Sequence, residues 1–287
     1  MKKILILLSF LVSVSSCSMQ KLAVRATTGV LENTLVALNE ENDLELAEIS
    51  IASNLKLLEG FLKSDPQNKK LLTFATFGYT SYAVGFVEPK SKDRAKNFYL
   101  RAKNFGLQVL ERNKDFKKAN RSSNEKDFRK SLKKFSKKDL EILFWTANAW
   151  GSFVNLSRND PFALAELWKP QALMERCLEL DETFYFAGPH LFFGTIKGSL
   201  PKILGGKPEE SKKHFDKALK ITEGKMLMIR VYFAKFYAIQ TQNREIFENQ
   251  LKQVLEFEIN QAPEIALMNT LAKERAKELL DDIDIYF

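Results

Sequence analysis

Residues that could carry out catalysis or bind a metal are scarce in this chain of 287 residues. It contains two histidines, His190 and His214, and neither belongs to a recognisable zinc-binding motif. Ser-x-x-Lys sequences, among them those at 131–134 and 199–202, match a nucleophile–base pattern, but such matches arise by chance in a Lys-rich chain. Phosphate-loop, dinucleotide and Gly-x-Ser-x-Gly motifs are absent from the sequence. We therefore predict a protein that is not an enzyme, holds no cofactor and no metal, and uses both histidines to cap or pack helices.

The N-terminal residues predict export and a lipid anchor. Two lysines precede an apolar run over residues 4–14, and small residues then lead to Cys17. This order is typical of a secretory signal peptide, and the run is shorter than the roughly 20 residues that a membrane-spanning helix needs. Residues 14–17, Val-Ser-Ser-Cys, resemble the bacterial lipobox, so we expect removal of residues 1–16 and diacylation of the Cys17 thiol. The alternative is an ordinary signal peptide followed by an unmodified cysteine.

The net charge of +8 is confined to one segment. Residues 114–138 contain eleven Lys or Arg and three acidic residues, so the rest of the chain is neutral. A nucleic-acid-binding protein spreads its basic residues over a surface, and we therefore predict no nucleic-acid partner. Three phenylalanines and Leu132 interrupt the lysines and would let a short helix dock. We interpret the segment mainly as a solvated excursion or a mobile linker, with anionic lipid or an acidic partner protein as the alternative.

Apolar side chains at helical spacing predict an all-α fold with a recurring corner. A stripe that ends at Leu62 is stopped by Ser-Asp-Pro at 64–66, and a new stripe runs from Leu71 to Phe86. Similar corners follow the helical patterns that end near Asp181 and Thr222. Helix, turn and helix at this spacing are typical of tetratricopeptide repeats, whose stacked pairs leave a curved groove. We predict a tetratricopeptide-like helical bundle or superhelix.

We divide the chain into three parts. Residues 1–16 are the signal peptide, 17–50 are the lipidated N-terminus with its tether and first helix, and 51–287 are the tetratricopeptide-like domain. The first helix is expected from Thr27 to Leu38, with its apolar residues on one face. After lipidation Cys177 is the remaining cysteine, so no disulfide can form within the mature chain, and its helical, apolar neighbours predict a buried thiol.

The stretch from Phe184 to Phe215 is rich in Gly and Pro between two apolar helical patterns. Pro removes a backbone donor and fixes φ, while Gly adopts the positive φ that side chains disfavour. The stretch therefore predicts a helix, a structured elbow inserted into the repeats, and a second helix that begins with Pro and two acids. The predicted elbow residues are Gly188, Pro189, Gly194, Pro201, Gly205, Gly206 and Pro208.

This stretch resembles the central motif of the T-component lipoproteins of tripartite ATP-independent periplasmic (TRAP) transporters. In that family a Gly- and Pro-containing elbow, Leu-Gly-Gly and a helix with His-Phe and Ala-Leu follow one another. Three more motifs match in chain order: RAKNFYLRA at 94–102, LFWTANAWG at 143–151, and the closing helix over 267–280. The matches extend from about Leu55 to Phe287, and the basic segment 114–138 is the part that departs most from the pattern.

The resemblance implies a non-catalytic lipoprotein that faces the periplasm and works with the solute-binding protein of a TRAP system. It also implies a homotrimer with pores of ligand size, which would pass an apolar small ligand to that binding protein. Ser18, which follows the lipidated cysteine, favours the outer over the inner membrane under the enteric sorting rule. The alternative function is a generic envelope scaffold that assembles protein complexes and binds no small molecule.

Aromatic residues supply the candidates for a ligand-lining surface. Trp145 and Trp150 lie five residues apart, so their rings point in different directions and both are buried only if their helix is central. No charged residue interrupts 187–196, which includes Phe192 and Phe193. We take these four aromatic residues as pore or ligand candidates, and packing in the core is the competing interpretation.

Overall fold

The computed structural model describes residues 21, 24, 27–122, 124–200 and 202–287. The predicted signal peptide, the lipidation site Cys17 and the elbow residue Pro201 lie outside these ranges. Every regular element within the described ranges is a helix and none is a strand, which confirms the all-α prediction.

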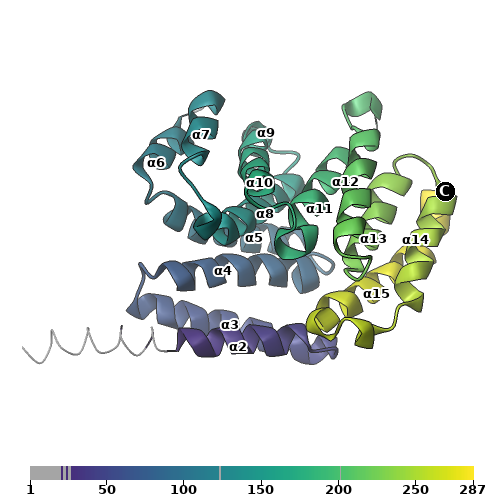
Figure 1. The fold of residues 1–287 in the computed structure, drawn as a ribbon, viewed down its shortest axis with the longest axis horizontal. Helices are drawn as coiled ribbons and strands as arrows, with labels where there is room; N and C mark the ends of the chain where they lie inside the picture. The colour runs from purple at the N-terminus through teal and green to yellow at the C-terminus, as the bar shows by residue number, and fades with distance from the viewer. Residues whose placement is uncertain (1–20, 22–23, 25–26, 123, 201) are drawn as a thin grey trace, which may run out of the picture.

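The helices follow one another with short connections (Figure 1). The α-helices are α2 (Thr28–Asn39), α3 (Leu44–Ser64), α4 (Lys69–Tyr82), α5 (Lys92–Leu110), α6 (Lys114–Arg121), α7 (Glu125–Leu132), α8 (Leu140–Leu156), α9 (Pro161–Ala165), α10 (Trp168–Leu180), α11 (Phe184–Gly198), α12 (Pro208–Ile221), α13 (Met228–Phe233), α14 (Arg244–Glu256), α15 (Ala266–Asp281) and α16 (Ile283–Tyr286). Short 3-10 and π segments are η1 (Ala83–Val87), η2 (Lys137–Asp139), η3 (Lys202–Leu204), η4 (Ala234–Ala238), η5 (Ile259–Gln261) and η6 (Pro263–Ile265).

The first predicted corner lies between α3 and α4. Helix α3 ends at Ser64, and the Asn68 side chain accepts hydrogen bonds from the backbone N–H groups of Lys70 and Leu71, which starts α4. Helix α4 then packs against α3, α5 and α8. Residues 50 and 51, between which the sequence analysis divides the chain, lie inside α3.

Helix α8 occupies the centre of the first half of the molecule, where it packs against α4, α5 and α10. Trp145 and Trp150 are 7% and 1% exposed, although they point in different directions. Two large rings on different faces are both buried because neighbouring helices surround α8.

The basic segment 114–138 is packed, and its interpretation as a solvated excursion or mobile linker is wrong. It forms α6, α7 and η2, and Phe116 and Phe128 are fully buried in the core. The Phe128 ring meets Phe116 at 5.2 Å and Trp168 at 5.1 Å between centroids. The apolar residues thus hold two amphipathic helices on the domain while most of the lysines remain exposed.

The predicted elbow has a different geometry from the one expected. Gly188, Pro189 and Gly194 lie inside α11, which is itself interrupted just before Gly188, at residues 185–187, and a second break follows α11, over η3 and the following turn. Gly205 supplies a positive φ of 88° in that turn, Gly206 follows it, and Pro208 is the first residue of α12. Pro189 fits within α11 because the right-handed helix starts at Gly188, so its missing N–H falls in the first turn.

Helices α12 to α15 complete the molecule and bring the chain back to its start. Helix α15 packs against α2 and α3 as well as α13 and α14. In Figure 1 this return is visible where α15 meets the right-hand end of α2 and α3. The N- and C-terminal parts of the described chain therefore enclose the space between them.

Candidate functional site

A cavity of about 880 Å³ lies at the centre of this enclosure. Its wall is built mainly from α2, α3, α4 with η1, α8, α11, α13 with η4, and α15, and α5, α9 and α10 add one residue each. Most of the lining is apolar, with Leu, Ile, Phe, Met and Trp side chains. Small-molecule sites in proteins have this size and this predominantly apolar character.

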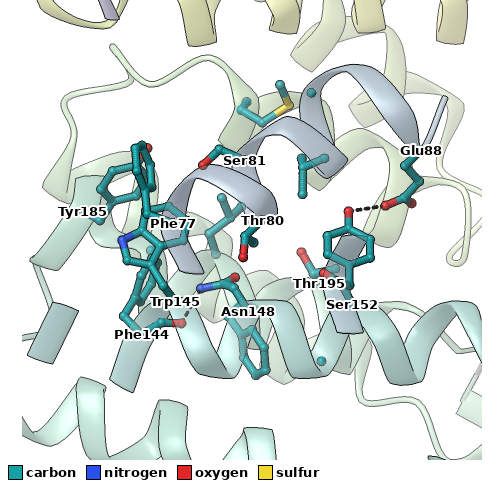
Figure 2. Close-up of a pocket in the computed structure, with 18 of the residues that line it drawn as sticks. Phe77, Thr80, Ser81, Glu88, Phe144, Trp145, Asn148, Ser152, Tyr185 and Thr195 are labelled. Atoms are coloured by element: carbon teal, nitrogen blue, oxygen red, sulfur yellow. Dashed lines mark hydrogen bonds between the residues drawn. The ribbon is translucent and has the colours of Figure 1, made fainter. Parts of the chain in front are cut away.

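One end of the cavity is aromatic (Figure 2). The Trp145 ring lies 4.7 Å from Phe77, 5.0 Å from Phe144 and 4.6 Å from Tyr185 between centroids, each in an edge-to-face arrangement. The Tyr185 hydroxyl contacts the sulfur of Met268 at 3.6 Å. Edge-to-face pairs of this kind fix the ring positions, so this end is a preformed apolar surface.

A left-handed turn positions part of this aromatic wall. Tyr185, Phe186 and Ala187 have φ values of 45°, 56° and 59°, a conformation that costs about 1–2 kcal/mol per residue outside glycine. The turn brings both Tyr185 and Phe186 to the cavity. The next residue, Gly188, admits the Phe144 ring, since a Cβ there would be 2.4 Å from Phe144 Cζ. Strain that is held by packing in this way is typical of functional sites.

The opposite end of the cavity is polar. The Tyr99 hydroxyl donates a hydrogen bond to Glu88, and Ser152 lies beside it (Figure 2). Burial, followed by the Glu88 carboxylate, raises the pKa of Tyr99 well above its usual value, so this hydroxyl stays protonated. Tyr232 and Arg275 line the same cavity from α13 and α15.

Two π-helical segments contribute to the wall. Val84, Gly85 and Phe86 of η1 and Phe236 of η4 are lining residues. The Arg275 guanidinium donates to the carbonyl oxygens of Val84 and Gly85 at 2.9 and 3.1 Å, which ties α15 to η1. Isolated π turns within α-helices occur frequently at functional sites.

The structure separates the four aromatic candidates into two groups. Trp145 and Phe192 lie on the cavity wall. Trp150 lies away from it, where its indole N–H donates to Glu166 at 3.1 Å and its ring faces the Lys103 ammonium at 4.2 Å. Phe193 packs against the ring of His214 at 5.4 Å between centroids and does not line the cavity.

The two histidines form a packed pair between α11 and α12. Their Nδ1 atoms are 3.0 Å apart, and His190 Nε2 lies 3.2 Å from Glu182. Burial, followed by the charge of His190, lowers the pKa of His214 to about 4. No cluster of three metal-ligating side chains occurs in the described parts of the chain. Cys177 is fully buried, and its burial raises the pKa of the thiol.

The sequence did not single out most of the wall residues. The sequence predicts a helix at 27–38, close to the observed bounds of α2. The apolar face of this helix is the sequence signal that could have pointed to the cavity wall. In the structure this face closes one side of the cavity, but α2 alone could not show what it covers. The half-buried α2 residues on the wall are Leu31, Thr34, Leu35, Leu38 and Asn39.

Comparison with known proteins places most of this chain in one family. A family model described as TAtT, TRAP transporter T-component, matches residues 40–287. No curated protein gives a significant match. Among the helices that the structure describes, none has the length and apolar character needed to cross a membrane. The match covers every described element from α3 onward and leaves α2 outside it.

Proposed function

Because this chain belongs to the TRAP transporter T-component family, we propose that it is a non-catalytic subunit that binds a small, mainly apolar molecule in its central cavity and passes it to the solute-binding protein of a TRAP system. The observation that carries the proposal is the cavity of about 880 Å³ with its aromatic end. A ligand that covers the apolar lining of this cavity gains free energy at roughly 25 cal/mol per Å² of apolar surface removed from water.

We propose further that the protein acts at a membrane surface on the periplasmic side. Signal peptidase would cut before Cys17, and the acyl chains would hold the protein to the membrane, the outer one in preference to the inner. The helix pairs would be tetratricopeptide-like units, and the protein would assemble as a homotrimer around which the binding protein docks. These proposals rest on the lipobox, the helix–turn–helix corners and the family membership.

The proposal is tested by filling the cavity. Ser81 is a half-buried wall residue, and Ser81→Phe would place a ring in the space that a ligand needs. We expect the variant to lose binding of the apolar fluorophore N-phenyl-1-naphthylamine at least tenfold while its circular dichroism stays unchanged. Asn104→Phe, at an exposed position of α5, is the matched control and should bind as the wild type does.

Native mass spectrometry of the Cys17→Ser protein tests the assembly. A trimer that takes up the solute-binding protein of the same TRAP system would support the transport role. A monomer that ignores that protein, together with equal fluorophore binding by wild type and Ser81→Phe, would refute the proposal and leave the scaffold function.

A further inference from the structure

Helices α6 and α7 each carry basic side chains along one side. In α6 they occur at i, i+3, i+4 and i+7, and in α7 and its C-terminal cap at i, i+4 and i+7, so each set lies on one side of its helix. All of them are exposed. These residues, which we call the basic face, are Lys114, Lys117, Lys118 and Arg121 of α6 and Lys126, Lys130 and Lys133 of α7.

The opposite side of both helices is buried, and this sets the direction of the basic face. Phe116 and Phe128 each lie two residues after the first lysine of their helix, which is about 200° around the helix axis. Both rings are fully buried, and their centroids are 5.2 Å apart. Because the rings point into the core, the basic face points away from the protein. Helices α6 and α7 lie next to each other at one end of the molecule (Figure 1).

The charges of the basic face are not neutralised by the protein. Within the described parts of the chain, no ion pair joins any of its residues to an acidic side chain. Arg129 of the same segment does pair, with Glu125 and Glu175. Eleven basic and three acidic residues leave a net charge of +8 over residues 114–138. An unneutralised cluster of this kind attracts anions.

The composition of the basic face favours a broad anionic surface over a single shaped anion. Six of its seven residues are lysines. A lysine ammonium is a hydrated point charge on a flexible stem, whereas arginine presents a rigid fork that suits one carboxylate or phosphate in a fixed position. No residue of the basic face lines the central cavity, so binding at the two places is measured separately.

Ion pairs connect the basic segment to α2 through the start of α4. Lys69 pairs with Asp139, which follows the segment directly, at 2.9 Å. The next residue, Lys70, pairs with Glu32 of α2 at 2.7 Å. In Figure 1 the first turns of α2 lie at the same end of the molecule as α6 and α7. The basic face and the start of α2 therefore belong to one end of the protein.

The predicted anchor is tied to this end by a short piece of chain. Val24 is buried in the same hydrophobic cluster as Phe116 and Phe128. It follows Cys17 by seven residues, which reach at most about 25 Å even when fully extended. A membrane that holds acyl chains at Cys17 therefore stays near this end of the protein, and the tether raises the local concentration of lipid there.

We propose that the basic face binds the anionic head groups of membrane phospholipids and gives the protein a second membrane contact beside its acyl chains. The inference rests on the proposed membrane attachment and adds an orientation to it. Helices α6 and α7 face the lipid, and the opposite end of the molecule, formed by α13 and α14, faces away from it (Figure 1).

Vesicle sedimentation tests the contact without the anchor. The protein is the mature chain, residues 17–287, with Cys17→Ser, so it carries no acyl chains. We expect it to bind vesicles of equimolar phosphatidylglycerol and phosphatidylcholine at least tenfold more tightly than vesicles of phosphatidylcholine alone. Raising the salt from about 0.1 M to 1 M shortens the Debye length from about 10 Å to 3 Å and should abolish the difference.

Charge reversal assigns the binding to the basic face. Lys117→Glu combined with Lys130→Glu should weaken binding at least tenfold, since each basic residue near an anionic surface contributes about fivefold. The matched control is Lys213→Glu with Lys220→Glu, two exposed positions of α12 that change the net charge equally. It should bind nearly as the wild type does. Lys117→Arg with Lys130→Arg keeps the charge and should also bind normally, and thermal unfolding checks that all three variants are folded.

The other outcomes would overturn the inference. They are equal binding to both kinds of vesicle, binding to neither, and an equal loss in the two Glu variants. If the Lys117→Glu, Lys130→Glu protein instead failed to take up the solute-binding protein in native mass spectrometry, and bound vesicles normally, the basic face would be a site for an acidic protein. The vesicle assay contains no acyl chains, so failure of the predicted anchor appears separately, in the membrane association of the Cys17→Ser protein in cells.

Discussion

At the scale of single residues, the properties of the two histidines depend on the side chains that the fold places beside them. His190 and His214, the two residues with the widest chemical repertoire, pair through their Nδ1 atoms, and His214 also packs against Phe193. A neutral pair can share one proton across the Nδ1–Nδ1 contact, whereas a doubly charged pair would repel. The contact therefore favours the neutral form of His214, whose pKa is lowered to about 4.

We predict an acid sensitivity from His214. Its pKa in the folded protein is about 4, below the usual 6.5, so the unfolded chain binds the extra proton between these values. Stability should thus be fully present above pH 6.5 and be lost as the pH falls towards 4, by about 2 kcal/mol at pH 5. Urea unfolding at pH 7.5 and pH 5 measures this, and His214→Gln should reduce the difference between the two pH values. An unchanged difference in the variant would contradict the assignment.

At the scale of elements, the two short helices α6 and α7 contribute large side chains to the hydrophobic core. Helices α6 and α7 have eight residues each, yet they place Phe116 and Phe128 in the same core as α8 and α10. Helix α2 does the converse, because its apolar face borders a cavity and not a filled core. Helices α6 and α7 are thus held by packing in the core, whereas α2 covers one side of the cavity.

We predict that Phe128→Ala destabilises the protein by about 3–5 kcal/mol, because the ring is fully buried against Phe116 and Trp168. Thermal and urea unfolding give the measurement. Lys126→Ala, at an exposed position of the same helix, should change stability by less than about 0.5 kcal/mol. If both substitutions were neutral, α7 would not be part of the core.

We predict that α2 contributes to ligand affinity. Leu35 lines the cavity, and its neighbour Val36 is 56% exposed on the other face of the helix. Leu35→Ser should weaken fluorophore binding roughly fivefold, since about 1 kcal/mol of apolar contact is lost. Val36→Ser should leave binding unchanged, so equal effects of the two substitutions would show that α2 is not part of the site.

At the scale of the whole molecule, the ends of the chain meet around one cavity. Helices separated by up to about 190 residues are joined by the bonds from Arg275 to Val84 and Gly85. The predicted anchor at Cys17 precedes Thr28, the first residue of α2, by only eleven positions. A lipid anchor at this position would hold the α2 side of the cavity close to the membrane surface.

We predict that Cys17→Ser abolishes membrane association and leaves the cavity intact. The unmodified protein should appear in the soluble fraction of cells, lack the mass of the acyl chains, and bind the fluorophore as the mature wild type does. Unchanged detergent partitioning and an unchanged mass would rule out the anchor.

The sequence by itself determined the features that depend on local spacing. Helical periodicity and turn residues predicted an all-α fold, the corner between α3 and α4, and a first helix at 27–38 where the structure has 28–39. The ordered motifs also identified the family that the match over 40–287 confirms. Each of these features depends on residues within a few helical turns of one another, so the sequence predicts them without knowledge of the neighbouring helices.

Only the tertiary structure decided which faces are buried and which border a cavity. A helix pattern looks the same beside solvent, core or cavity, so the packed basic segment was misjudged and Trp145 could not be separated from Trp150. The left-handed turn at 185–187 is held by its surroundings against its own conformational preference. The polar end likewise brings together side chains of α5, α8, α13 and α15, and no local sequence pattern shows that these helices meet.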